Sequence, residues 1–325
     1  MGYKVAVLMG GQSFEREFSL ESGKLVCQVL EEMGHEVLPL DTVSDLVDTL
    51  KSENVDVAYI ALHGKHGEDG TIQSLLEFLN IPYVGCTAPV CRVTRNKSNI
   101  PHVISSHRVD GSGAASWPAQ MCLSVDAFKS MGAACALKSY EEHIPGYPMV
   151  VKPACGGSAM GLHKVHSFDE LASAILDALS FDDEVIVGEW VDGVELGVSM
   201  VEDAEGNVRV LPPVEICSTH EFFDTSDRMD SDGVEFFAPP RSEQLSDSSA
   251  IERINAAAIE TFKAFGCRDL ARVDMIWDGH EPKILEIDVS PGMTKRSFFP
   301  TACKAAGLTL GEVLSDLLDK AVKRS

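Results

Sequence analysis

The hydrophobic pattern of about the first 90 residues alternates between two periods. Short apolar runs typical of buried strands are each followed by a stretch with apolar residues on one helical face. Leu20, Val26 and Leu30 share such a face. Gly34 then follows as a stop signal. The pattern predicts strands at 4–11, 35–41, 55–64 and 81–85, and helices at 19–34, 44–53 and 71–80.

This strand–helix alternation predicts a mostly parallel sheet with helices on both faces. Ligands of such sheets bind at the carboxyl ends of the strands, where the loops 10–19 and 63–71 lie. A lone loop histidine is usually a surface residue, but His63 closes a strand end at which ligands gather. These loops supply Ser13, Glu15, Glu17, His63, Glu68 and Asp69.

The pattern changes near residue 95, where a basic, partly helical stretch begins. The segment 147–165 resembles two strands joined by a glycine-rich loop. Strands at 184–191, 194–203, 208–216, 271–278 and 285–288, helices at 167–179, 249–266 and 309–322, and an acidic loop near 222–235 follow. The chain is therefore expected to be an α/β protein throughout.

Composition and charge narrow the class of protein. A chain of 325 residues, 45% hydrophobic and 24% charged, is too long for one ordinary core, so two or three domains are expected. The net charge of −23 argues against a nucleic-acid partner, which normally requires a basic face. An anionic ligand would need local basic residues and metal ions.

The cysteines and apolar runs bear on the compartment. Nine cysteines are scattered without a CxxC pair, which argues against a disulfide framework or a zinc site and favours reduced thiols in a cytosolic protein. The first apolar run is too short for a signal peptide, and no run reaches the length of a membrane span. No membrane partner is expected.

The glycine-rich loop contains Gly156, Gly157, Ser158 and Gly161. It lacks the GK[ST] sequence that opens the helix of a P-loop, and strand-like residues follow it. Its backbone N–H groups could fold over phosphates, although a hairpin turn without a ligand remains an alternative. Lys152 precedes the loop in an apolar strand, where a phosphate would be a natural partner for its charge.

Three carboxylates lie on what the pattern predicts to be a β-hairpin with Gly279 in its turn. Glu286 and Asp288 are two residues apart, so they share a face, and Asp274 lies on the preceding strand. Hard oxygen ligands beside a phosphate site suit Mg²⁺, with a solvated acidic face as the alternative. Arg272 shares the face of Asp274 and could stabilise an oxyanion.

The segment after the hairpin adds two candidates. The turn at Gly292 offers backbone N–H donors, and Ser297 offers a hydroxyl group. Ser297 is equally well explained as the N-cap of a helix that begins with Phe298.

Together these motifs resemble the D-alanine–D-alanine ligases of the ATP-grasp superfamily, and the resemblance covers nearly the whole chain. Six motifs in the same order carry it, which makes it far more specific than any one motif. They are GGQSFEREFSLESG (10–23), ALHGKHGEDGTIQSLLEFLNIPYVG (61–85), YPMVVKPACGGSAMGLHKV (147–165), FFDTSDRM (222–229), ARVDMIWD (271–278) and LEIDVSPGMT with SFFP (285–300).

The resemblance implies a three-domain ATP-grasp fold with a Rossmann-like, parallel-sheet N-terminal domain. The expected divisions are 1–95 for substrate binding, 96–190 for the central domain with its glycine-rich lid, and 191–325 for the C-terminal domain with the metal site. It also implies that ATP phosphorylates the carboxylate of one D-alanine, and that the amine of a second attacks the acyl phosphate. The product would serve peptidoglycan precursor synthesis in the cytoplasm, and a homodimer is expected.

Roles follow from the matching positions. Glu15 would bind the ammonium group of the first D-alanine, with His63 beside it. Arg272 and the Gly292 N–H would form the oxyanion site, and Ser297 would bind the carboxylate of the second substrate. Ser158 of the glycine-rich loop and Arg228 of the lid are implied catalytic residues, with Arg228 contacting phosphate. The remaining implied roles are phosphate binding by Lys97, Lys152 and Gly157, adenine binding by Glu189, Trp190 and Val191, ribose binding by Glu195, and coordination of two Mg²⁺ or Mn²⁺ ions by Asp274, Glu286 and Asp288.

The chain departs from the family pattern at several positions. Asp288 stands where Asn is usual, and Arg228 and Met229 replace a usual Lys-Tyr pair. Met229 lacks the tyrosine hydroxyl that in the family bonds to the glycine-loop serine, here Ser158. The segment at 95–97 reads Arg-Asn-Lys in place of Met-Asp-Lys. Alternatives are therefore a ligase that uses D-serine, or less readily D-lactate, as second substrate, and a degenerate binder of nucleotide or D-amino acid.

Overall fold

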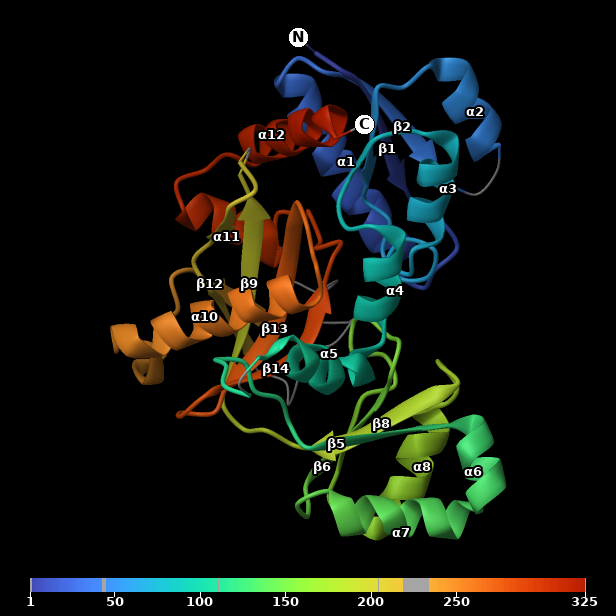
Figure 1. Ribbon diagram of the computed structural model, residues 1–325, viewed down its shortest axis with the longest axis vertical. Helices are drawn as coiled ribbons and strands as arrows, with labels where there is room; N and C mark the ends of the chain where they lie inside the picture. The colour runs from blue at the N-terminus through green and yellow to red at the C-terminus, as the bar shows by residue number, and fades with distance from the viewer. Residues whose placement is uncertain (1, 43–44, 110, 204, 219–233, 325) are drawn as a thin grey trace.

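The computed structural model describes residues 2–42, 45–109, 111–203, 205–218 and 234–324. The chain forms three sheets along the length of the molecule, and the sheet built from residues 194–288 lies between the N-terminal sheet and the sheet built from residues 120–189 (Figure 1). The first is parallel and the other two are antiparallel, so the expected α/β class with a parallel N-terminal sheet is confirmed. Among the described residues, no helix combines the length and the apolar character needed to cross a bilayer.

The N-terminal sheet has the strand order β2-β1-β3-β4, and all neighbouring strands are parallel. Its strands are β1 (Lys4–Met9), β2 (Glu36–Asp41), β3 (Val57–Ile60) and β4 (Tyr83–Val84), and its helices are α1 (Arg16–Glu32), α2 (Leu46–Glu53) and α3 (Thr71–Leu79). Strand β1 is apolar on both faces because helices cover both. Val5 and Val7 face the core that contains α1, and Leu8 faces the core shared with α2 and α3.

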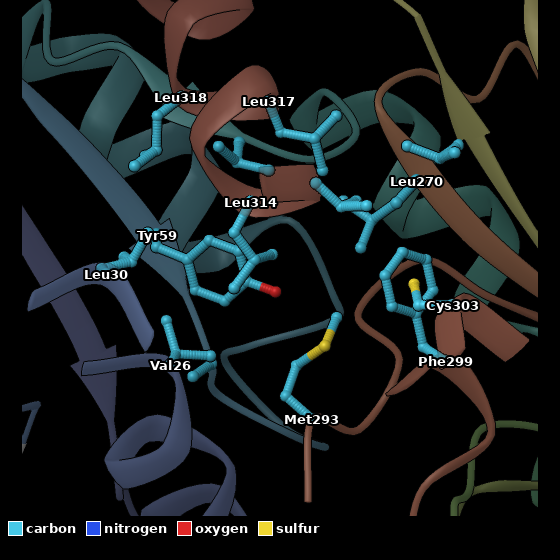
Figure 2. Close-up of a cluster of buried hydrophobic side chains, with 14 of the residues drawn as sticks. Val26, Leu30, Tyr59, Leu270, Met293, Phe299, Cys303, Leu314, Leu317 and Leu318 are labelled. Carbon is cyan, nitrogen blue, oxygen red and sulfur yellow. The ribbon is translucent and has the colours of Figure 1, made fainter. Parts of the chain in front are cut away.

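The last helix of the chain, α12 (Leu310–Lys323), completes the first sheet. Its apolar stripe places Leu314, Leu317 and Leu318 in one core with Leu30 of α1 and Tyr59 of β3 (Figure 2). Helix α12 is drawn beside α1, far from the central domain (Figure 1). A capping box at Thr309 fixes the start of this helix.

The central sheet has the order β5-β8-β6-β7 and is antiparallel throughout. The strands are β5 (Gln120–Ser124), β6 (Met149–Pro153), β7 (His163–Val165) and β8 (Glu184–Glu189), with helices α6 (Val125–Met131), α7 (Ala133–His143) and α8 (Phe168–Ala178). The glycine-rich loop joins β6 to β7, as the pattern predicts. The elements between 120 and 143 were not predicted, because their apolar residues follow no clear strand or helix period and only Ala136 and Tyr140 of α7 are buried.

The C-terminal sheet has the order β12-β11-β9-β13-β14, with β10 paired to β9. Its elements are β9 (Val194–Glu202), β10 (Val208–Val210), β11 (Val214–Ser218), β12 (Val234–Phe237), β13 (Leu270–Trp277), β14 (Pro282–Asp288), α10 (Ser248–Ala264), α11 (Phe298–Ala305) and the 3₁₀ helix η2 (Glu243–Leu245). The predicted hairpin is confirmed, with Gly279 at φ 92° in its turn. The pairing register between β13 and β14 shifts after Asp274, so side chains near Leu285 do not follow the simple alternation between the two faces of the sheet. Leu285 lines a cleft.

A linker joins the first two sheets through α4 (Ala88–Arg95), η1 (Lys97–Asn99) and α5 (Ile100–His107). Ile100 and Ile104 of this linker share a core with Ile254 of α10. Helix α5 therefore packs against the C-terminal sheet region, just as α12 packs against the N-terminal sheet. The domain divisions at 95 and 190 stay a prediction.

Candidate active site

Three adjoining pockets form one cleft where the three sheets meet. The first is lined from all three regions, by Glu15, by Gly157 and by Asp288 among others. It shares Lys97 and Glu286 with the second pocket, and the second shares residues such as Lys152 and Glu195 with the third. The cleft therefore runs from the strand ends of the N-terminal sheet to the space between the central and C-terminal sheets.

The third pocket is open to solvent and has a volume of about 970 Å³. Its walls are mainly apolar, and Val150, Ile276 and Leu285 are among the lining residues. The predicted adenine and ribose residues Glu189, Trp190, Val191 and Glu195 all line it. A large apolar slot with a few polar groups at its edge is typical of sites for small planar ligands.

Two lysines project into the cleft where the pockets join. Lys97 lies 3.1 Å from Glu286 (Nζ–Oε2) and donates a hydrogen bond to the carbonyl of Gly156. Lys152 is half-buried, and the desolvation of its ammonium group, together with the nearby charge of Lys97, lowers its pKa to about 8. An anion bound between these lysines would stabilise both charges.

The hairpin brings the three predicted carboxylates to one end of the sheet. Asp274 pairs with Glu286 across the strands, and Arg272 pairs with Asp288. Arg272 donates bidentately to Asp274 at 2.5 and 2.7 Å, and its Nη1 lies 3.1 Å from Asp288 Oδ2. The predicted sharing of a face by Arg272 and Asp274 is confirmed.

The charges in this cluster are unequal. Burial raises the pKa of Asp274 to about 6 and also raises that of Asp288, even though Arg272 opposes the shift. Burial would raise the pKa of Glu286 as well, but Lys97 and Arg272 lower it overall. The three carboxylates thus carry more negative charge than the two neighbouring cations, Lys97 and Arg272, neutralise.

Within the described ranges, no three His, Cys, Asp or Glu side chains are arranged to hold a metal ion. The reason is geometric: Arg272 bridges Asp274 and Asp288, and Lys97 faces Glu286. The donor set nevertheless fits a hard divalent cation, because all three groups are carboxylates and two have raised pKa values in a crowded, buried site.

Glu15 lies at the N-terminal end of the cleft, just before α1. Its Oε1 accepts a hydrogen bond of 2.8 Å from the hydroxyl of Ser158 in the glycine-rich loop. A Cβ atom at Gly157 would lie 2.7 Å from the same oxygen, and one at Gly64 would lie 2.4 Å from Oε2. The two loops therefore close around this carboxylate only because glycine stands at both positions.

His63 is buried beside Glu15, and Phe18 lies against its ring at 4.7 Å between centroids. Its Nδ1 lies 3.5 Å from Glu68, which also accepts a 2.7 Å bond from Arg95. Burial alone would raise the pKa of Glu68, but His63 and Arg95 lower it to about 2. His63 is therefore an ordered, buried group and not a surface histidine.

Gly292 and Ser297 lie together across from His63. A Cβ atom at Gly292 would lie 2.4 Å from the ring of Phe18 and 2.9 Å from Ser297 Oγ, so the turn requires glycine here. Ser297 occupies the N-cap position of α11, but its hydroxyl makes no capping bond. The hydroxyl instead accepts from the Thr294 N–H at 3.1 Å and lies 2.9 Å from Thr294 Oγ1.

Phe298 supports Arg272 from below. The guanidinium carbon of Arg272 lies 4.8 Å from the centroid of the Phe298 ring, and Phe236 of β12 packs edge-on against the same ring. Gly197 on β9, opposite Asp274, leaves the space that the ring occupies. The Phe298 ring thus fixes the position of the Arg272 guanidinium group relative to the sheet.

Replacing Gly197 by Ala should lower kcat/KM about 10- to 100-fold, because displacing a positioned group by about 1 Å has effects of that size. The new Cβ would lie 2.4 Å from Phe298 Cδ1 and force the ring, and with it Arg272, to move. The matched control is Ser199→Ala on the same strand, since the buried Ser199 hydroxyl has no hydrogen-bond partner among the described residues. Equal activity of Gly197→Ala and Ser199→Ala in steady-state assays would contradict the role of Phe298.

Several residues that line or support the cleft were not predicted from the sequence. Arg95 could have been noticed, because it belongs to the departure from the usual Met-Asp-Lys segment. Gly197 interrupts an apolar strand, which is a known sign of close approach. The apolar Phe18 gave no signal. Arg228 and Met229 lie outside the described residues.

The family model described as "D-ala D-ala ligase C-terminus" matches residues 119–319, and the one described as "D-ala D-ala ligase N-terminus" matches residues 41–86. The chain belongs to the D-alanine–D-alanine ligase family.

Particular relatives are similar over their whole length. The chain is 36% identical to a D-alanine–D-alanine ligase from Desulforamulus reducens, with 100% of both proteins covered. A crystal structure of a D-alanine–D-alanine ligase from Bacillus anthracis is similar at a TM-score of 0.81 and 28% identity, covering 99% of this chain and 98% of that one. The VanG D-Ala:D-Ser ligase from Enterococcus faecalis has a TM-score of 0.81 and 27% identity, with 99% and 100% covered.

Proposed function

We propose that this protein joins two molecules of D-alanine to D-alanyl-D-alanine at the expense of ATP. The observation that carries the proposal is the single cleft that connects Glu15 and His63 at one end to the apolar slot at the other. Arg272 and Gly292 line the same end as Glu15. Asp274 and Glu286 line the pocket between the two ends, where the amino acid and the terminal phosphate of ATP would meet.

ATP would bind with adenine in the apolar slot and its phosphates toward Lys97 and Lys152. Glu189, Trp190 and Val191 would contact the base, Glu195 the ribose, and Gly157 the phosphates through its backbone N–H. Arg228 would also contact the phosphates, and this role rests only on the resemblance of its sequence motif. The two lysines would neutralise phosphate charge and hold the terminal phosphate in line with the carboxylate of the amino acid.

Divalent metal ions, either Mg²⁺ or Mn²⁺, would be held by Asp274, Glu286 and Asp288. Two such ions would bind together. When bound, they would supply charge neutralisation to the triphosphate during phosphoryl transfer. The residues of the chain do the positioning. Lys97 and Arg272, which face the carboxylates in this structure, would then be free to contact phosphate oxygens.

The chemistry at the amino acids follows from the charges around them. The carboxylate of Glu15 would hold the ammonium group of the first D-alanine near His63. Arg272 and the Gly292 N–H would stabilise the negative oxygen that forms when the second amine attacks the acyl carbon and phosphate leaves. Ser297 would bind the carboxylate of the second D-alanine, and the glycine-rich loop would keep water from the acyl phosphate.

D-Serine and D-lactate are the competing second substrates, since Met229 replaces the usual lid tyrosine. The relatives named D-alanine–D-alanine ligase favour D-alanine over both. A homodimer in the cytoplasm completes the proposal, and light scattering on the purified protein would test the dimer.

The proposal is tested by incubating the purified protein with ATP, Mg²⁺ and D-alanine and identifying the product by mass. D-Alanyl-D-alanine from D-alanine alone is expected. A mixed product formed only when D-serine or D-lactate is added would replace the proposed second substrate. ATP binding without turnover on any of the three would instead support the degenerate binder.

The affinity for ATP should fall as the pH rises through about 8, the pKa to which burial and Lys97 lower Lys152 in the free protein. The ammonium form, which binds phosphate, is present below that pKa and is lost above it. A bound triphosphate raises the pKa again, so binding above this pH should take up a proton. Titration calorimetry in buffers of different ionisation enthalpy measures that uptake.

Lys152→Arg is the matched control for this pH effect, because a guanidinium group stays charged over the whole range. The variant should bind ATP with little pH dependence. An unchanged pH dependence in Lys152→Arg would assign the titration to another group.

A further inference from the structure

Ser22 is a fully buried polar residue on α1 that no role described so far uses. Its hydroxyl oxygen lies 3.2 Å from His63 Nε2 and accepts a hydrogen bond of 3.2 Å from the backbone N–H of Met293. Ser22 therefore joins the histidine of the N-terminal strand ends to the turn that follows β14. These groups come from separate parts of the sequence and meet only in the folded chain.

The contacts continue on the far side of the histidine. His63 Nδ1 faces Glu68 Oε1 at 3.5 Å, and Arg95 holds the other oxygen of Glu68 at 2.7 Å. The result is one buried polar chain, Arg95–Glu68–His63–Ser22–Met293. We refer to it as the Ser22 chain.

The Met293 end of the Ser22 chain has a fixed direction. The backbone N–H of Met293 can only donate, so Ser22 Oγ accepts from it. The hydroxyl keeps a second lone pair and its own proton for His63 Nε2, so it can hold the ring in place whichever of the two atoms donates. Ser22 thus orients the imidazole ring and at the same time anchors the turn.

The anchored turn is the one that carries Gly292. The Met293 side chain is buried in the core shared by α1, β3 and α12 (Figure 2), and its N–H is held by Ser22. On the other side, Gly292 lies directly against the ring of Phe18, which also belongs to α1. Helix α1 therefore sets both the position and the tilt of the peptide group that presents the Gly292 N–H.

We propose that Ser22 is a positioning residue for the ligase reaction, which couples the orientation of His63 to the geometry of the Gly292 oxyanion turn. This inference rests on the proposed function, because it assigns a partner to the oxyanion site. Ser22 touches no substrate. It acts through the two groups that do, so its loss should slow turnover more than it weakens ATP binding.

The first test compares Ser22→Ala with Ser19→Ala in steady-state kinetics. Ser19 is also fully buried on α1, and its hydroxyl bonds to Gly10 N and Ala61 O, away from the turn. Ser22→Ala should lower kcat about 10- to 100-fold, the usual effect of losing an outer-shell partner, with the KM for ATP little changed. Ser19→Ala should keep a near-normal kcat. Equal kcat values for the two variants would overturn the proposal.

Ser22→Cys separates hydrogen bonding from packing. The thiol restores most of the side-chain volume but is a weak donor and acceptor, so this variant should remain about as slow as Ser22→Ala. Recovery of normal kcat by cysteine would show that Ser22 only fills space, and would overturn the proposal.

A second readout is independent of the reaction and of substrate. Long-range ¹H–¹⁵N NMR spectra of the imidazole rings resolve the two ring nitrogens of His63, identified by the loss of their signals in His63→Gln. The Nε2 signal should shift in Ser22→Ala and stay in place in Ser19→Ala, because only Ser22 contacts this nitrogen. No shift in Ser22→Ala would overturn the inference even if the wild-type protein makes the expected dipeptide. A wild-type protein with the expected spectrum but no dipeptide product would fault the proposed function alone.

Discussion

Replacing Glu286 by Gln should abolish ligase activity, with a loss of at least about 10³-fold in kcat/KM, while the protein stays folded. Glu286 is the one carboxylate of the hairpin cluster whose pKa is lowered, so it carries a full negative charge although it is half-buried. It lines both the first and the second pocket of the cleft and faces Lys97 at 3.1 Å. The amide removes the negative charge that faces Lys97 and that would bind the proposed metal ion.

The cost in stability should be small, about 1 kcal/mol, because the ion pair of Lys97 and Glu286 is partly exposed. Phosphate release in the presence of D-alanine measures the activity, and chemical denaturation measures the free energy of unfolding. Normal turnover at ordinary Mg²⁺ concentrations would remove Glu286 from the metal site.

Asp288→Asn provides the matched control for Glu286→Gln. It makes the same acid-to-amide change two residues further along the same strand, and it restores the residue usual in the family. Arg272 keeps its bidentate contact with Asp274, and an amide oxygen can still bind a metal ion, so the loss should stay within about tenfold. Equal losses in the two variants would mean that only the total charge of the cluster matters.

Replacing Arg272 by Met should reduce both activity and stability. The guanidinium is 3% exposed and contacts two carboxylates, Asp274 and Asp288, which would be left buried without their counter-charge. The expected loss of stability is about 3–5 kcal/mol, and the loss of kcat is at least about 10²- to 10³-fold. Denaturant unfolding and steady-state kinetics measure the two effects.

The pH dependence of the Arg272→Met protein has a definite sign. Without the arginine, the pKa values of Asp274 and Asp288, already raised by burial, should rise further. A carboxyl whose pKa is higher in the folded than in the unfolded state stabilises the fold at acidic pH, and this contribution is lost as the pH rises through the folded-state value. Acidification should therefore recover part of the lost stability relative to wild type.

Arg272→Lys tests whether charge alone suffices. It keeps the positive charge but lacks the planar fork, so it should recover much of the stability and little of the activity. Full activity in Arg272→Lys would show that the bidentate geometry and the stacking on Phe298 are dispensable.

Local features of the fold could be predicted from the sequence, whereas contacts between distant segments could not. The parallel sheet and the hairpin could be predicted because strand and helix periods, and turn residues such as Gly279, are local signals. The positions of Glu15, His63, Asp274 and Glu286 around one cleft followed from motif order and from the rule that ligands gather at strand ends.

What could not be predicted depends on contacts between distant segments. The bond between Glu15 and Ser158 spans 143 residues, and the bond between Ser22 and Met293 spans 271. A buried serine on a helix looks the same in sequence whether it bonds to its own helix or to a catalytic turn. The contact between Arg272 and Phe298 also leaves no signal in the sequence, because an aromatic residue after a turn is most often an ordinary core residue.

The packing of α12 on the N-terminal sheet has a consequence for the order in which the protein can be built. A ribosome releases residues 1–85 long before residues 310–323, yet Leu314, Leu317 and Leu318 belong to the core around Tyr59 and Leu30 (Figure 2). Part of the apolar face of the N-terminal sheet therefore stays uncovered until α12 has emerged from the ribosome. Nascent chains that lack residues 310–323 should be more vulnerable to proteolysis and aggregation than chains that contain them.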